Sequence, residues 1–326
     1  METTVLAEKI ARGDRRALAR AITLVESARP DHRALAAEVL AALDPARQAL
    51  RIGLSGTPGV GKSTFIESFG LMLTGLGKRV AVLAVDPSSA RSGGSILGDK
   101  TRMERLSRDP KAFIRPSPSQ SQLGGVARRT REAIALCEGA GFDVVLIETV
   151  GVGQSETAVA EMSDLFLLLL APAGGDELQG VKRGIMETCD MILVNKADGD
   201  LRPQAMRTCS DYAGALRLLR RRSQDPEGFP KALTVSALET GGIEDAWAEM
   251  QSLIAWRRDR GIWDQRRAGQ ALFWFREEVR AGLLAALEED PSIATLLEDL
   301  QARVASGELL PALAADHLVQ RFRGKG

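Results

Sequence analysis

Cysteine and histidine are scarce in this sequence, and that scarcity excludes two kinds of protein. Its 326 residues include three cysteines and two histidines. Cys137, Cys189 and Cys209 lie at no spacing typical of metal ligands, and an odd, sparse set does not form a disulfide framework. We therefore expect neither a cysteine-based metal centre nor a disulfide-stabilised secreted domain, but a protein of the reducing cytoplasm.

Long apolar runs and an excess of one charge are also lacking. The longest apolar stretch, residues 165–171, is far shorter than the roughly 20 residues that a membrane-spanning helix needs. The start, METTVLAEKI, has no basic segment followed by an apolar run, so we expect no signal peptide. Basic and acidic residues number 43 each, which gives no overall charge favouring nucleic acid. The composition predicts a cytoplasmic globular protein with neither a membrane nor a nucleic-acid partner.

What the sequence does contain is a glycine-rich segment, GTPGVGKST, at residues 56–64. An apolar stretch precedes it and a helical stretch, residues 63–76, follows it. Glycines let successive backbone N–H groups face one anion, and the start of a helix adds a favourable dipole. This context predicts a phosphate-binding loop in which Lys62 reaches the β- and γ-phosphates and Ser63 binds Mg²⁺. The expected nucleotide contacts are Gly56, Thr57, Pro58, Gly59, Val60, Gly61, Lys62, Ser63 and Thr64.

Short apolar runs alternate with helical segments from residue 50 onward. The expected strands are residues 50–55, 80–85, 112–115, 143–148, 165–170, 191–195 and 233–236. Several of these runs are apolar throughout, which is typical of strands buried on both faces of a mostly parallel sheet. The alternation predicts a doubly wound α/β fold of the P-loop NTPase class, in which ligands bind at the carboxyl ends of the strands.

Helical segments flank this predicted core. Apolar positions recur at helical spacing from Leu6 to Val25, Pro30 breaks this run, and residues 35–43 resume it. We expect an N-terminal helical extension (1–48), a GTPase domain (49–260) and a C-terminal helical arm (261–326). In the arm, a long helix at 265–289 carries the aromatic cluster 273–275. Either this helix packs on its own domain, or the arm makes a homodimer, because a terminal hairpin has little core of its own to cover such a stripe.

A base-recognition motif, Asn195-Lys196-Ala197-Asp198, follows the sixth expected strand. The Asp198 carboxylate can accept hydrogen bonds from N1–H and the exocyclic amine of guanine, a donor pair that adenine lacks. Asn195 either braces the loop or contacts the base, and the Lys196 stem stacks on the ring. The segment Ser236, Ala237 and Leu238 is expected to complete the pocket. These residues predict GTP and GDP as ligands.

Acidic residues at strand ends predict the Mg²⁺ site. Glu148 ends the fourth expected strand and runs into the glycine-rich GVGQ segment, where Gly151 can donate its N–H to the γ-phosphate. Gln154 either positions the attacking water or caps the following helix. Asp86 and Asp99 are further candidate metal ligands. We expect Lys62, Glu148 and Gln154 to carry catalysis.

Together these motifs resemble the MeaB family of GTPases, also labelled ArgK, whose human member is MMAA. The matching segments are GTPGVGKST, VDPSS with GGSILGDKTRM, FIRPSPSQSQLGGV, ETVGVGQSE, PAGGDELQG and NKAD. The resemblance implies a homodimeric G-protein chaperone for an adenosylcobalamin-dependent acyl-CoA mutase, usually methylmalonyl-CoA mutase. It implies that nucleotide state gates cofactor loading from an adenosyltransferase. The loop holding Asp176 and Lys182 matches the family's additional switch, which reports on the partner.

Two other functions are compatible with a phosphate-binding loop, a nickel-insertion GTPase and a P-loop kinase. A nickel-insertion GTPase needs histidine or cysteine ligands, and this sequence has only His32 and His317 with no cysteine–histidine cluster. A P-loop kinase needs an acceptor pocket and has no use for the NKAD motif. The residues therefore favour a GTPase chaperone over both.

Overall fold

The computed structural model describes residues 2–85, 103–116, 123–149, 155–172, 183–219, 222, 224–288 and 290–324. These residues fall into two compact units, Met1–Arg267 and Ala268–Gly326. In the described residues, no helix is both long and apolar enough to cross a membrane.

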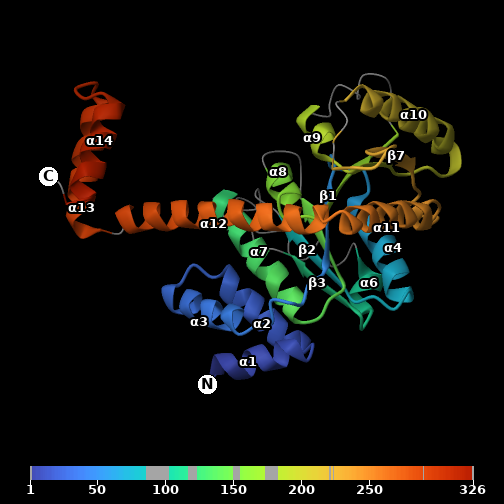
Figure 1. Ribbon diagram of the computed structural model, residues 1–326, viewed down its shortest axis with the longest axis horizontal. Coiled ribbons are helices and arrows are strands. Elements are labelled where there is room, and N and C mark those ends of the chain that lie inside the picture. Colours follow the sequence, from blue (N-terminus) through green and yellow to red (C-terminus); the bar gives the residue numbers. More distant parts are fainter. Residues whose placement is uncertain are drawn as a thin grey trace. The chain divides into compact units, whose positions relative to one another are not determined.

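A parallel sheet forms the centre of the first unit (Figure 1). Its strands are β1 (Leu50–Ser55), β2 (Val80–Val85), β3 (Ala112–Pro116), β4 (Val144–Thr149), β5 (Leu165–Leu170), β6 (Met191–Val194) and β7 (Lys231–Thr234). Their order is β3-β2-β4-β1-β5-β6-β7, and every neighbouring pair runs parallel. This arrangement confirms the predicted doubly wound α/β fold.

Burial explains why the strands were readable from the sequence. Every residue of β2, β4, β5 and β6 is buried, as expected for strands covered on both faces. The edge strand β7 is half-buried throughout and begins at Lys231, which pairs with Met191. It therefore lies two residues earlier than the expected 233–236. The apolar pattern misplaced it because a half-exposed edge strand can begin with a polar residue.

Helices cover both faces of the sheet. They are α4 (Lys62–Gly75), α6 (Glu104–Arg108), α7 (Leu123–Gly139), α8 (Ser155–Ala160), α9 (Arg183–Thr188), η3 (Gly199–Leu201), α10 (Arg202–Leu218) and α11 (Ile243–Asp259). Helix α4 buries Phe65, Ile66, Phe69 and Leu73 completely. The Phe69 ring meets Trp247 of α11 edge-on at 5.8 Å, so these two helices share one hydrophobic core.

The N-terminal extension consists of α1 (Glu2–Ala11), α2 (Arg15–Glu26) and α3 (Pro30–Ala41). The apolar run from Leu6 to Val25 is interrupted, because Gly13 adopts a φ of 79° and Asp14 caps α2. The Asp14 carboxylate accepts from the N–H groups of Arg16 and Ala17 at 2.8 and 3.0 Å. Pro30 stands in the first turn of α3, where its missing N–H costs nothing.

Helix α12 (Ile262–Glu288) begins in the first unit, and α13 (Pro291–Ala305) and α14 (Pro311–Phe322) belong to the second. Helix α13 begins at Pro291, and it contacts α14. Helix α12 exposes large apolar side chains: Leu272, Phe273, Phe275, Val279, Leu283 and Leu284.

Candidate functional site

The glycine-rich loop lies at the carboxyl end of β1, the central strand of the sheet, and leads directly into α4. Two glycines are required by close packing. A Cβ on Gly56 would lie 2.3 Å from the Leu169 carbonyl oxygen, and one on Gly61 would lie 2.7 Å from Asn195 Nδ2. Gly61 also has a φ of 90°, which side chains rarely adopt. The loop can therefore follow this path only with glycine at these positions.

Lys62 points into this loop. Its Nζ donates to the carbonyl oxygen of Gly56 at 2.7 Å and to that of Thr57 at 3.4 Å. Burial lowers the pKa of Lys62, while the negative charges of Glu148 and Glu156 oppose that shift. The ammonium group is thus held at the loop by carbonyl oxygens, in the position from which it can reach a phosphate.

The oxygen ligands expected for Mg²⁺ fit that ion. Ser63 is half-buried in the first turn of α4, and Glu148 is buried in β4, where it pairs with Leu54 of β1. A hydroxyl and a carboxylate are hard donors, and Mg²⁺ at phosphate sites uses one or two carboxylates beside substrate phosphates. No group of three or more histidine, cysteine, aspartate or glutamate side chains that could hold a metal ion occurs in the described ranges.

Several expected site residues lie outside the described residues. They are Asp86, Asp99, Gly151, Gln154, Asp176 and Lys182. Their roles stay predictions. In the sheet, β4 lies between β1 and β2. The end of β2 is therefore one strand further from the phosphate loop than Glu148 is.

Asn195 connects the phosphate loop with the segment after β7. Its Nδ2 donates to the carbonyl oxygen of Val60 at 2.9 Å, and its Oδ1 accepts from the N–H of Ala237 at 2.9 Å. The side chain is buried. Next to it, Lys196 Nζ donates to the Gly59 carbonyl oxygen at 2.7 Å. Through these bonds, Asn195 and Lys196 join the segment after β6 to the phosphate loop, and Asn195 joins it to the segment after β7.

Asp198 and Ser236 come together from the ends of β6 and β7. The Ser236 hydroxyl donates to Asp198 Oδ2 and accepts from the N–H of Glu239 at 3.0 Å. The Ser236 hydroxyl thereby fixes one oxygen of the Asp198 carboxylate. Leu238 is 78% exposed, so its side chain forms no wall of a buried pocket.

Glu156 is a further candidate site residue, to which the sequence motifs assign no role. It lies in the first turn of α8, which packs on β1, β4 and β5, and it is buried. Its charge acts on Lys62 together with that of Glu148. Glu156 is the last residue of the ETVGVGQSE segment, so the sequence motif contains it. Only the fold, however, brings its charge near Lys62.

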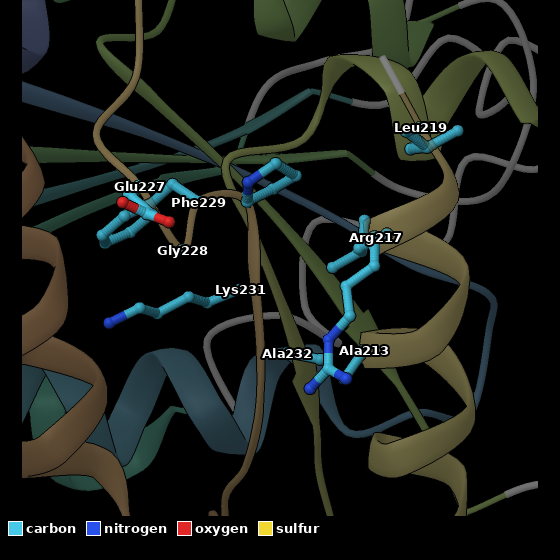
Figure 2. Close-up of a pocket in the computed structure, with 10 residues that line it drawn as sticks. Ala213, Arg217, Leu219, Glu227, Gly228, Phe229, Lys231 and Ala232 are labelled. Carbon is cyan, nitrogen blue, oxygen red and sulfur yellow. The ribbon is translucent and has the colours of Figure 1, made fainter. Parts of the chain in front are cut away.

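A cavity of about 530 Å³ lies away from these motifs, between the end of α10 and the start of β7 (Figure 2). Arg217 reaches it from α10 and Lys231 from β7. Lys231 pairs with Glu249 at 2.6 Å and its Nζ lies 4.7 Å from the Phe229 ring centroid. The glycine-rich loop, Asn195 and Ser236 follow the carboxyl ends of strands, where ligands bind in this class of fold, whereas this cavity lies at the amino end of β7.

Comparison with known proteins agrees with this geometry. The family described as methylmalonyl-CoA mutase-associated GTPase MeaB matches residues 18–292. A putative GTPase of Caulobacter vibrioides is 52% identical and is covered over 97% of both chains. The mitochondrial methylmalonic aciduria type A homolog of Mus musculus is 49% identical over 97% of this chain and 78% of its own.

A solved structure, titled LAO/AO transport system kinase, has the same fold along nearly the whole chain. It is 37% identical, with a TM-score of 0.77, and the match covers 98% of this chain and 97% of the other.

Proposed function

The chain belongs to the MeaB family of GTPases, and from this premise we propose that it is the GTP-hydrolysing chaperone of an adenosylcobalamin-dependent acyl-CoA mutase. The observation that carries guanine recognition is the pairing of Asp198 with Ser236, beside the Asn195 brace to the phosphate loop. The family description supports a mutase of the methylmalonyl-CoA type as the partner.

In the proposed reaction, the loop at 56–64 binds the phosphates, and the Lys62 ammonium group stabilises the negative charge that develops on the γ-phosphate. Bound Mg²⁺ would neutralise charge on the phosphate oxygens. Ser63 and Glu148 would hold it, with Asp86 and Asp99 as further ligands. Gln154 orients the attacking water, and Gly151 senses the γ-phosphate through its N–H.

The partner acts through the glycine-rich loops. The segments at 91–102, 151–154 and 173–181 are rich in glycine, the residue that loses the most backbone freedom when a segment takes up a single conformation. A mutase that binds the conformation competent for hydrolysis raises its population, and with it the rate of hydrolysis. Asp176 and Lys182 report on the partner, and the nucleotide state gates loading of cofactor from an adenosyltransferase.

The oligomer and the domain limits complete the proposal. The apolar side chains on α12 support a homodimer formed through the C-terminal arm, residues 261–326. Residues 1–48 are the helical extension and 49–260 the GTPase domain. The cytoplasm is the proposed compartment.

A GTPase assay with and without methylmalonyl-CoA mutase tests this function. We expect slow phosphate release alone and faster release with the mutase. Lys182→Ala should lose the acceleration and keep basal turnover, while Lys78→Ala, at an exposed position before β2, serves as the matched control. Equal rates of phosphate release with and without the mutase, over a range of mutase concentrations, would contradict the chaperone proposal.

A kinase is the second candidate, since one solved relative carries that title. Phosphate released to water and phosphate transferred to an acceptor can be measured in the same reaction with labelled GTP. We expect all label in inorganic phosphate. Label in a small-molecule acceptor would favour the kinase.

A further inference from the structure

One hydroxyl group joins the helix that starts at the phosphate loop to the segment expected to hold guanine. Ser68 lies on α4, and its Oγ donates a 2.6 Å hydrogen bond to the carbonyl oxygen of Ala237. A serine inside a helix commonly turns its hydroxyl to a carbonyl of the preceding turn. Ser68 instead bonds a residue 169 positions away, so this contact belongs to the tertiary structure.

Ala237 is held at both of its backbone polar groups. Its N–H donates to Asn195 Oδ1 at 2.9 Å, and its carbonyl oxygen accepts from Ser68. Ala237 is 3% exposed, so a carbonyl that lost its donor would be poorly placed to bond water instead. The position of this residue therefore depends on two side chains that come from different elements.

The neighbour of Ala237 fixes the base-reading carboxylate. Ser236 donates its hydroxyl to Asp198, and its own N–H donates to the Gly241 carbonyl oxygen at 2.8 Å. A shift of the backbone at Ala237 moves the adjacent Ser236 and, with it, the partner of Asp198. Asn195 ties this segment to Val60 of the phosphate loop, and Ser68 ties it to the body of α4.

We propose that Ser68 is a positioning residue for guanine recognition, which sets the segment after β7, and through it Asp198, relative to the phosphate-binding helix. The proposal rests on the base pocket proposed above. Ser68 acts through Ala237 and Ser236, not on the nucleotide. The ligand is a guanine nucleoside diphosphate or triphosphate, because only the binding of a base with a pair of hydrogen-bond donors depends on how accurately the Asp198 carboxylate is placed.

Calorimetry of GDP and IDP binding to the full chain, with Mg²⁺, tests this role. Loss of one neutral hydrogen bond predicts roughly two- to tenfold weaker GDP binding in Ser68→Ala. IDP lacks the exocyclic amine, so the ratio of the two affinities measures how well Asp198 is placed. We expect the preference for GDP over IDP to shrink, whereas a purely structural defect would weaken both nucleotides alike.

Matched variants isolate the hydroxyl group. Ser68→Thr keeps the hydroxyl and adds a methyl group, and Ser68→Val has the shape of that variant with the hydroxyl replaced by a methyl group. The Thr variant should therefore bind GDP like the wild type, and the Val variant should bind it like the Ala variant. Ser107→Ala is the control, because the Ser107 hydroxyl donates to the Glu104 carbonyl oxygen of its own short helix, at 2.8 Å. It should leave both affinities unchanged.

Wild-type GDP affinity and wild-type GDP over IDP preference in both the Ala and Val variants would overturn the role of Ser68. Asp198→Ala in the same assay separates this outcome from a failure of the base pocket. If Asp198→Ala removes the preference while the Ser68 variants keep it, only the inference on Ser68 is wrong. If Asp198→Ala also keeps the preference, the pocket itself is wrong, and the Ser68 role falls with it.

Discussion

At the scale of single residues, Lys62 is the side chain whose geometry ties it most directly to chemistry. Its Nζ bonds two loop carbonyl oxygens, Gly56 and Thr57, rather than a distant element. We expect Lys62→Ala to slow phosphate release at saturating GTP by roughly 100-fold or more, because it removes a cation from the developing phosphate charge. The melting temperature should change little. An unchanged rate would rule out this role.

Asp198 determines base selectivity in the proposed pocket. Loss of a hydrogen bond to a charged group costs about 1.5–3 kcal/mol, so Asp198→Ala should reduce the preference for GTP over ATP by roughly one to two orders of magnitude. Titration calorimetry with both nucleotides measures it. Asp200→Ala, an exposed acidic residue two positions on, is the control and should keep the preference. Wild-type protein that binds ATP as tightly as GTP would refute guanine selectivity.

The sequence could point to candidate residues that belong to local motifs. It could not point to residues whose partners come from distant parts of the chain. Asn195 and Asp198 stand in a strand-terminal tetrapeptide, and the structure brings them to Val60 and Ser236. Ser68 belongs to no local sequence motif, because its hydrogen-bond partner, the Ala237 carbonyl oxygen, lies far along the chain. Glu156 had a motif but no assignable partner until α8 packed against β1.

At the scale of elements, a buried ionic cluster joins α11 to Asp190, which directly precedes β6, and to Asp225 in the segment between α10 and β7. Arg257 Nη2 lies 2.5 Å from Asp190 Oδ1 and 2.6 Å from Asp225 Oδ1, and all three side chains are at most 1% exposed. Removing one partner of a buried pair leaves uncompensated charge. Asp190→Asn should therefore lower the free energy of unfolding by about 3 kcal/mol, measured by urea denaturation. Asp31→Asn, in an exposed pair with Arg29, should have a much smaller effect.

The same carboxylate predicts a pH dependence. Burial alone would raise the pKa of Asp190, but the charges of Arg257, Arg266 and Arg222 outweigh it and hold that pKa below its ordinary value. The pKa of Asp190 is lower in the folded state than in the unfolded state. The ion pairs of Asp190 therefore give their full stabilisation above the ordinary pKa of about 4, and this stabilisation is lost as the pH falls through the folded-state pKa. Stability of Asp190→Asn should thus fall less steeply in acid than that of the wild type. Parallel slopes would contradict this sign.

Elements were predictable where burial was complete and harder where it was partial. The apolar runs of β2 and β5 match the structure residue for residue. The edge strand β7 begins at a lysine, and the apolar pattern could not mark that start. In the N-terminal extension, the apolar spacing continues across the break at Gly13, where glycine and the Asp14 cap decide the geometry.

At the scale of the whole molecule, the apolar side of α12 carries the proposed homodimer. Leu272, Phe275, Val279 and Leu283 recur at helical spacing, and each is at least 45% exposed. Contiguous exposed apolar surface of this kind usually marks an interaction site. The sequence predicted the stripe and its helix, while the residues that a second copy would contact depend on an assembly that one chain does not contain.

A paired substitution tests the dimer without shortening the chain. Phe275→Glu with Leu283→Glu places two charges on the stripe, where burying them in an interface would cost several kcal/mol. We expect the wild type to run as a dimer at micromolar concentration by light scattering, and the double variant as a folded monomer with basal GTPase activity. Leu218→Glu, on α10 and 89% exposed, is the control and should stay dimeric. A monomeric wild type, or a double variant that remains dimeric, would place any oligomer contact elsewhere on the molecule.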